Sequence, residues 1–284
     1  MHLTRVRPRR SVTALVAAAA VSLLVASCSA SEDSQDPEEK PAAAEVTPPP
    51  VHGGFDYQLG GAYPPPAGTS IVARDHTASP APGTYSICYV NAFQAQPDAE
   101  GEWADDLLLR DVDGEVVVDP DWDEALLDIR TEAKRERVAR TVNAWIDTCA
   151  AKGFDAVEPD NYDTYTRAPD GLLTAEDAKA FLALLAGHAH AKGLAVAQKN
   201  TPDLAADREE VGLDFAVAEE CGRYDECDAY TAAFGRHVVD VEYEKRGMER
   251  ACAGWGEEIS VVLRDRDVLP RGDSGYVRET CDSL

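Results

Sequence analysis

Short apolar runs recur along the chain at the length and spacing of β-strands. Eight such runs cover residues 56–59, 70–75, 85–91, 154–160, 194–199, 214–220, 238–243 and 259–264. Several are apolar almost throughout, a pattern typical of strands buried on both faces of a parallel sheet. Several also end abruptly in charged or amide side chains, which indicates that their tips open into a polar environment.

Helical patterns separate most of the later strands. Residues 124–152 carry apolar positions at helical spacing, and residues 174–191 begin with a capping-box pattern formed by Thr174 and Asp177. Gly153 and Gly193 follow directly and are expected to end these helices. The alternation predicts an α/β fold with a parallel sheet, and eight strands in one domain predict a closed (β/α)8 TIM barrel.

The first third of the barrel is expected to have irregular connections. Residues 60–69 and 76–84 are rich in Pro and Gly and too short for a helical crossover. Residues 107–111 and 115–119 flank Asp113-Gly114, which predicts an inserted hairpin instead of barrel strands.

Two of the predicted strands end in carboxylates. They are Phe-Asp-Ala-Val-Glu-Pro-Asp-Asn (residues 154–161) and Asp-Phe-Ala-Val-Ala-Glu-Glu-Cys (residues 214–221). Desolvating a carboxylate is costly, so such strand ends indicate a functional site, although an Asx or N-cap turn at each end is an alternative. Because barrel active sites lie at the carboxyl ends of the strands, these acids are expected to face one cleft. Two acids across a cleft are what glycoside hydrolysis requires.

The N-terminus has the features of an export signal. A basic start with four arginines precedes an apolar stretch, residues 12–25, that is short for a membrane span. The following Val25-Ala26-Ser27-Cys28 resembles the lipobox of bacterial lipoproteins, which implies cleavage before Cys28 and lipidation of its thiol. Ordinary cleavage nearby, with Cys28 left free, is the alternative.

These features predict three segments. Residues 1–27 are expected to be a lipoprotein signal peptide, residues 28–50 a disordered tether, and residues 51–284 the catalytic domain. The protein is expected to be exported and anchored to the outer side of a bacterial cell membrane, with the lipid as its only membrane contact.

Six further cysteines are an even number, which in an exported protein suggests disulfides. Fifteen connectivities are possible. Proximity in sequence favours Cys221 with Cys227 and Cys252 with Cys281, which leaves Cys88 with Cys149. No CxxC or Cys/His spacing supports a metal site, and we expect neither a metal nor a cofactor.

The chain is strongly acidic. It has 27 Lys and Arg against 52 Asp and Glu, a formal net charge of −25. Such a charge repels nucleic acid and attracts a polycation. Solubility in salt is the alternative explanation.

Five motifs together resemble glycoside hydrolase family 114. They are FDYQLGGAY (residues 55–63), CYVN (88–91), EPDN (158–161), AQKN (197–200) and EEC (219–221) with Cys227. The similarity runs in order through nearly all of residues 55–281. It implies a (β/α)8 enzyme, and the activity named for the family is endo-α-1,4-polygalactosaminidase. The substrate is a galactosamine polymer, which is cationic at neutral pH when it is not acetylated.

The resemblance also implies a catalytic pair. The family's acids lie on the fourth and sixth strands and fall here on Asp160 and Glu219. Strand alternation by itself leaves Glu219 and Glu220 equivalent, and Ala218 stands where the family often has Asn. We assign Asp160 as the nucleophile, because Lys199 on the intervening strand can hold it ionised, and Glu219 as the general acid/base.

Other polar residues are expected to bind substrate at the barrel mouth. They are Asp56, Tyr63, Asn91, Glu158, Asn161, Lys199, Asn200, Glu220, Glu242 and Arg264. Structural alternatives stay open for four of them: Glu158 orienting Lys199, Lys199 serving only as a barrel ion pair, Tyr63 packing on the rim, and Glu242 pairing with Arg264. Tyr89 is expected in the core.

The sequence therefore favours a monomeric, endo-acting glycoside hydrolase that cleaves α-1,4-linked, galactosamine-rich polysaccharide by a two-carboxylate mechanism. A non-catalytic carbohydrate-binding surface lipoprotein is the alternative. The opposed acids favour the enzyme, because binding alone does not need them.

Overall fold

A computed structural model of the chain describes residues 46–97 and 99–283. The predicted signal peptide, Cys28 and the expected tether up to residue 45 lie outside the described residues. Residues 46–50, the end of the expected tether, contact the barrel. The Tyr85 hydroxyl donates to the carbonyl of Thr47 at 2.7 Å, and His237 Nδ1 lies 2.9 Å from the carbonyl oxygen of Pro49.

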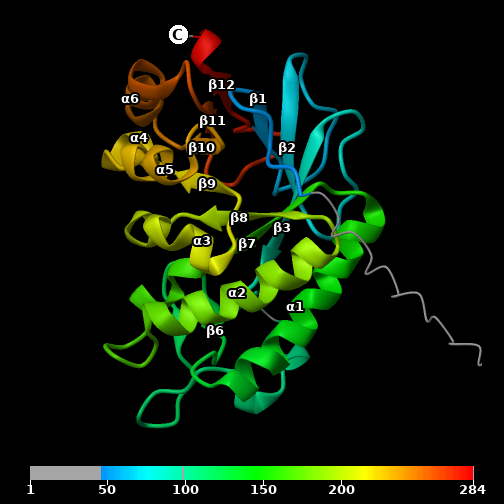
Figure 1. The fold of residues 1–284 in the computed structure, drawn as a ribbon. Helices are drawn as coiled ribbons and strands as arrows, with labels where there is room; N and C mark the ends of the chain where they lie inside the picture. Colours follow the sequence, from blue (N-terminus) through cyan, green and yellow to red (C-terminus); the bar gives the residue numbers. More distant parts are fainter. Residues whose placement is uncertain (1–45, 98, 284) are drawn as a thin grey trace, which may run out of the picture. The chain divides into compact units, whose positions relative to one another are not determined.

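Eight parallel strands form the barrel in the order of the sequence (Figure 1). They are β1 (Gly54–Tyr57), β2 (Thr69–Asp75), β3 (Tyr85–Asn91), β7 (Ala156–Asp160), β8 (Ala195–Lys199), β9 (Phe215–Glu219), β10 (Val238–Glu242) and β11 (Ser260–Arg264). Strand β11 lies beside β1, and β12 (Arg278–Thr280) pairs antiparallel with β11. Arg278 of β12 also donates to the carbonyl of Phe55 in β1 at 2.9 Å. The predicted barrel and its eight strands are confirmed.

The helices follow the later strands and lie outside the sheet (Figure 1). They are α1 (Glu132–Lys152), α2 (Ala175–Ala191), α3 (Arg208–Val211), α4 (Cys221–Tyr224), α5 (Cys227–Phe234) and α6 (Lys245–Trp255). The Thr174 capping box before α2 is confirmed. The prediction of helix from residue 124 is wrong, because α1 begins after the N-cap Thr131.

A small sheet is inserted between β3 and α1. It consists of β4 (Gln94–Ala95), β5 (Val118–Asp119) and β6 (Glu124–Leu126), all antiparallel. The expected hairpin is present, with a bridge between Arg110 and Val116. The first connections, between β1, β2 and β3, contain no helix among the described residues and are irregular, as expected.

Apolar side chains form one cluster inside the barrel and a second between the sheet and its helices. Along β9, Phe215 and Val217 belong to the inner cluster, while Ala216 and Ala218 belong to the outer one. Because side chains alternate along a strand, Glu219 continues the inward row. By the same alternation, the side chains at the ends of β7 and β8 point into the barrel mouth.

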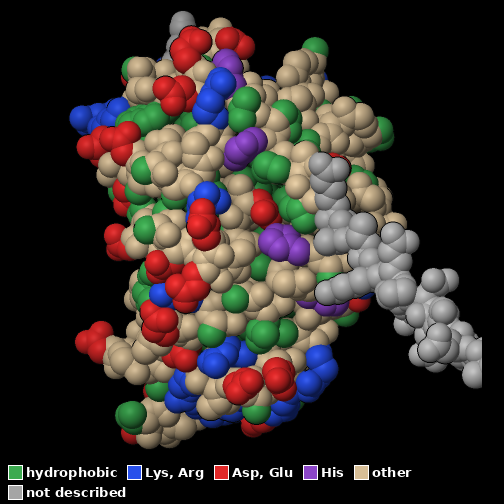
Figure 2. Space-filling view, viewed as in Figure 1, with side chains coloured by type: hydrophobic (Ala, Val, Ile, Leu, Met, Phe, Trp, Pro, Cys, Tyr) green, Lys and Arg blue, Asp and Glu red, His purple; other side chains and the backbone are tan. Residues whose placement is uncertain are grey.

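Three disulfides join the elements with the pairing that sequence proximity favours. Cys88–Cys149 links β3 to α1, Cys221–Cys227 links α4 to α5, and Cys252–Cys281 links α6 to the segment after β12. On the face shown in Figure 2, lysine and arginine side chains gather near the lower end, while acidic side chains are found mostly toward the left side and the centre. Within the described residues no helix is long and apolar enough to span a membrane.

Candidate active site

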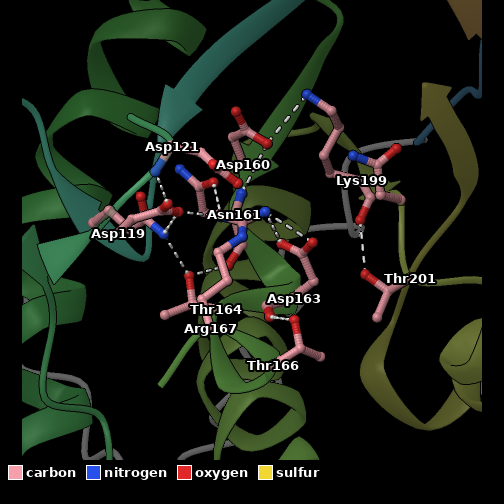
Figure 3. A network of polar contacts seen from close by, with 12 residues as sticks. Asp119, Asp121, Asp160, Asn161, Asp163, Thr164, Thr166, Arg167, Lys199 and Thr201 are labelled. Atoms are coloured by element: carbon pink, nitrogen blue, oxygen red, sulfur yellow. Dashed lines mark hydrogen bonds and ion pairs between the residues drawn. The ribbon is translucent and has the colours of Figure 1, made fainter. Parts of the chain in front are cut away.

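Four charged side chains meet where β7, β8 and β9 end. The Lys199 ammonium lies 3.1 Å from Asp160 Oδ1, 3.3 Å from Glu219 Oε2 and 3.2 Å from Glu158 Oε1. Figure 3 shows Lys199 reaching from its strand toward Asp160. All four side chains point into the barrel. Side chains alternate along a strand, and each of the four stands two or four positions after an apolar residue of the inner cluster.

Three tyrosines complete this cluster. Tyr89 donates to Asp160 Oδ2 at 2.7 Å, Tyr57 donates to Glu158 Oε1 at 2.6 Å, and Tyr243 donates to Glu219 Oε1. The expectation that Tyr89 is a core residue is wrong, because its ring lines the cleft and its hydroxyl binds Asp160. The signal that could have found these residues is alternation: Tyr57 and Tyr89 each stand two positions beyond an inward apolar residue.

The cluster places one ammonium among three carboxylates. Burial by itself raises the pKa of Asp160, but Lys199 and the hydrogen bonds from Tyr89 and the Asn161 amide outweigh it and hold this pKa below its ordinary value. Burial raises the pKa of Glu158 to about 7, and Lys199 only partly opposes that shift. Burial lowers the pKa of Lys199, but its acidic neighbours raise it well above the ordinary value. Asp160 is therefore an ionised carboxylate held by an ammonium.

Glu219 and Glu220 point to different places. Asn200 donates to Glu219 Oε2 at 3.0 Å and accepts from the Glu219 amide at 2.8 Å, so Glu219 is held at the cleft. Glu220 has a φ of 60° and pairs with Arg223 and Arg266. A left-handed backbone is uncommon outside Gly and Asn, and here it turns the chain immediately after the strand. The choice left open by the sequence is settled in favour of Glu219 facing Lys199.

A polar network fixes the loop after Asp160 (Figure 3). Asn161 has a φ of 67°, its amide donates to Asp160 Oδ1 at 2.8 Å, and its side chain donates to Asn91 Oδ1 at 2.9 Å. Arg167 donates to Asn161 Oδ1 at 2.8 Å and forms an ion pair with Asp119 of the inserted sheet at 3.0 Å. The inserted sheet thereby supports the loop that follows the central carboxylate.

Glu124 of β6 lies beside this network, and sequence reasoning missed it because it fell within a predicted helix. Its Oε2 accepts from Asn91 Nδ2 at 2.9 Å. Burial raises the pKa of Glu124 to about 7, and the charge of Asp160 adds to the shift. Glu124 therefore lines the cleft near Asp160 as a carboxyl group that gains its proton near neutral pH.

The cleft has two connected lobes. The central lobe, about 370 Å³, is lined by Asp160, Lys199 and Glu124 among others. The acidic lobe, about 450 Å³, extends away from Asp160 and is lined by residues after β7, β8 and β9. Both lobes share Trp122, Asn200, Glu219, Tyr243 and Arg266. The residues that line only the acidic lobe include Asp163, Asp203, Tyr224, Glu226 and Tyr230.

Three of the predicted substrate-binding residues lie at the barrel seam instead of the cleft. Asp56 accepts from Tyr63 at 3.0 Å and is 3.2 Å from Arg278 and 3.6 Å from Arg264. Asp56 and Arg264 are almost fully buried. These charges neutralise one another inside the fold, so the prediction that Asp56, Tyr63 and Arg264 bind substrate is not supported by their positions.

The other predicted residues divide between the cleft and the layer behind it. Asn161, Lys199, Asn200 and Glu220 line the cleft, whereas Glu158 and Asn91 support it from behind. Neither alternative for Glu242 holds: it is fully buried and accepts from the Gly222 amide at 2.7 Å at the start of α4.

Within the described part of the chain, one group of potential metal ligands lies close together: Cys221, Cys227 and Asp240. The two cysteines are joined in a disulfide, which leaves one carboxylate. This group therefore does not have the donors that a metal ion needs.

A (β/α)8 barrel that holds two carboxylates over an open cleft is compatible with glycoside hydrolysis. The sequence profile of glycoside hydrolase family GH114 matches residues 36–284, and the chain belongs to this family. It is therefore a glycoside hydrolase, and its substrate is a polysaccharide. Among curated proteins, none matches the sequence.

Two solved structures are similar to the barrel. Ega3 of Aspergillus fumigatus, in complex with galactosamine, has a TM-score of 0.67 and 24% identity, over 84% of this chain and 98% of that chain. The glycoside hydrolase domain of PelA from Pseudomonas aeruginosa has a TM-score of 0.54 and 13% identity, over 78% of this chain and 97% of that chain. Both likenesses establish the fold.

Proposed function

We propose that the chain is an endo-acting hydrolase of α-1,4-linked, galactosamine-rich polysaccharide, with Asp160 as the nucleophile and Glu219 as the general acid/base. The observation that carries this proposal is that both carboxylates contact the same buried ammonium, that of Lys199, from the strands on either side of it. The nucleophile must be ionised, and the depressed pKa of Asp160 supports that role.

The reaction follows from these positions. Asp160 attacks the anomeric carbon while Glu219 donates a proton to the departing glycosidic oxygen, which forms a glycosyl ester on Asp160. Glu219 then takes a proton from water, and the water oxygen attacks the same carbon and releases Asp160. The two carboxylate oxygens lie 3.1 and 3.3 Å from Lys199 Nζ. Because one ammonium holds both acids, they lie at the same part of the cleft, where both can reach one glycosidic bond.

Three observations support an amino-sugar substrate. The cleft is lined by several carboxylates, and the chain carries a formal net charge of −25, which favours a cationic polymer. Ega3, a similar barrel, binds galactosamine in its structure. A cleft that continues on both sides of Glu219 fits endo action, because an internal bond needs room for sugars in both directions.

The cellular setting is part of the same proposal. The signal-like N-terminus, the Cys28 lipobox and three disulfides fit an exported lipoprotein that meets its substrate outside the membrane. The lipid on Cys28 would be its only contact with the membrane.

The test is product release. Purified protein is incubated with an α-1,4-galactosamine polymer and with a panel of neutral and acetylated polysaccharides, and the products are identified by mass spectrometry. Internal cleavage of the galactosamine polymer into oligomers is expected. Saturable binding without any product would instead favour the non-catalytic carbohydrate-binding lipoprotein.

A further inference from the structure

The acidic lobe contains two carboxylates that no cation holds. Over residues 46–97 and 99–283, the side chains of Asp203 and Glu226 form neither an ion pair nor a hydrogen bond, although both line the lobe. The neighbouring acids differ, because Asp163 and Glu220 are each paired with arginine. Both carboxylates line the same lobe; burial raises the pKa of Glu226, and the charge of Asp203 raises it further.

A tyrosine whose side chain is largely buried also lines the lobe. Tyr230 is 2% exposed and lines the lobe, and its hydroxyl makes no hydrogen bond within the described part of the chain. Burial raises the pKa of Tyr230, and the charge of Glu226, which lines the same lobe, raises it further. Because Tyr230 lines the lobe and no group in the described residues pairs with its hydroxyl, this hydroxyl is available to a ligand in the lobe.

The Cys221–Cys227 disulfide fixes one wall of the lobe. It closes a short loop that contains both Tyr224 and Glu226, and the Glu226 amide donates to the carbonyl of Cys221 at 2.9 Å. Tyr224 is 56% exposed and lines the lobe from the same loop. The loop that carries this carboxylate and aromatic ring is held by the disulfide before a ligand binds, which lowers the entropy cost of ordering the loop on binding.

The positions of the catalytic pair assign a direction to the chain of sugars. Asp160 lines only the central lobe, whereas Glu219 lines both lobes. The sugar whose anomeric carbon is attacked must lie against Asp160, in the central lobe. The sugar on the departing oxygen must lie beyond Glu219, which is in the acidic lobe.

We propose that the acidic lobe is the subsite for the sugar on the reducing-end side of the cleaved bond, and that it selects an unacetylated amino sugar whose ammonium is held by Asp203, Glu226 and the Tyr230 hydroxyl. This inference rests on the proposed function. An ammonium supplies three donors and a positive charge, whereas an N-acetyl group supplies one neutral donor and leaves the carboxylates unpaired.

The test measures whether the sugar on the reducing-end side of each cleaved bond is acetylated. A partially N-acetylated α-1,4-galactosamine polymer is digested, and the non-reducing ends of the new fragments, which come from this subsite, are sequenced by mass spectrometry. Wild-type fragments are expected to begin with an unacetylated sugar. Glu226→Gln and Asp203→Asn are each expected to lower kcat/KM on fully unacetylated polymer about tenfold or more, and to admit acetylated sugars at that end.

The matched control is Glu209→Gln, which makes the same change at a side chain that is 85% exposed and outside the cleft. Equal effects in the control and the lobe variants, or unchanged fragment ends in the lobe variants, would overturn the inference. Calorimetric binding of an unacetylated galactosamine trisaccharide provides a readout without turnover. Weaker binding by Glu226→Gln in a protein that cleaves nothing would refute the proposed function and uphold the subsite. Normal cleavage with unchanged binding would refute the subsite alone.

Discussion

The ammonium of Lys199 lies 3.1 Å from the carboxylate of Asp160 on the adjacent strand of the barrel. The Lys199 side chain is 2% exposed, so this ion pair operates with little screening by water. The same ammonium reaches Glu158 and Glu219, which makes Lys199 the centre of charge on which the proposed chemistry depends.

Replacing Lys199 should therefore affect both stability and pH dependence. In Lys199→Met, Glu158 loses its cation inside the barrel, and breaking such a buried pair costs about 3–5 kcal/mol in unfolding free energy. Asp160 also loses the cation that lowers its pKa, so the acidic limb of kcat/KM should move to higher pH. Urea denaturation and a pH–rate profile measure the two effects.

The double variant Lys199→Met with Glu158→Gln separates the effect on stability from the effect on the acidic limb of kcat/KM. Removing the Glu158 charge should restore part of the stability without restoring the acidic limb. An acidic limb that stays in place in both variants would show that Lys199 does not set the ionisation of Asp160.

Glu219 and Glu220 offer a matched pair of substitutions. Glu219→Gln removes the proposed general acid and should lower kcat by about 10²–10⁴. Glu220→Gln changes a residue that faces Arg223 and Arg266 instead of Lys199, and it should cost far less. Steady-state kinetics on galactosamine polymer, with circular dichroism to check folding, distinguishes them. A larger loss in Glu220→Gln would reverse the assignment.

Glu124 should make stability depend on pH. Its pKa rises from 4.5 to about 7 on folding, so the folded state favours the protonated form. The associated stabilisation is complete below pH 4.5 and is lost as the pH rises through about 7. Denaturation at pH 5 and pH 8 should show that wild type loses stability relative to Glu124→Gln at the higher pH. An equal stability difference at both pH values would contradict this.

The disulfides should differ in their contributions. Cys88–Cys149 closes a separation of 61 residues and Cys221–Cys227 one of 6. On the chain-entropy relation, they stabilise by about 4 and about 2 kcal/mol respectively. Unfolding free energies of the two double Cys→Ala variants test this. The reverse ranking would mean that local packing, not loop length, dominates.

The sequence predicted the barrel well because strands buried on both faces leave long apolar runs, which need no tertiary information to recognise. A strand that is apolar on both faces shows no alternation, so its sequence does not indicate which side chains point into the barrel. For this reason Glu219 and Glu220 could be distinguished only in the structure, where Glu220 has a positive φ. Glu124 was lost in a predicted helix, since a strand of three residues is too short to show a period.

Residues that depend on distant partners were the hardest to predict. Arg264 was assigned to the cleft because it stands at a strand end, but it lies at the barrel seam near Asp56, which also pairs with Arg278 of the last strand. Glu242 bonds to the amide of Gly222, a contact that only the packing of α4 creates. Asp160 and Lys199 were placed correctly because neighbouring parallel strands bring their ends together.

The most direct test of the proposed chemistry is the configuration of the first product. Wild-type protein is mixed with α-1,4-galactosamine polymer, and the anomeric proton of the new reducing end is followed by NMR before mutarotation. With Asp160 as the nucleophile, the α-anomer forms first. If the β-anomer forms first, Asp160 is not a nucleophile, and the cleft instead activates water for direct displacement.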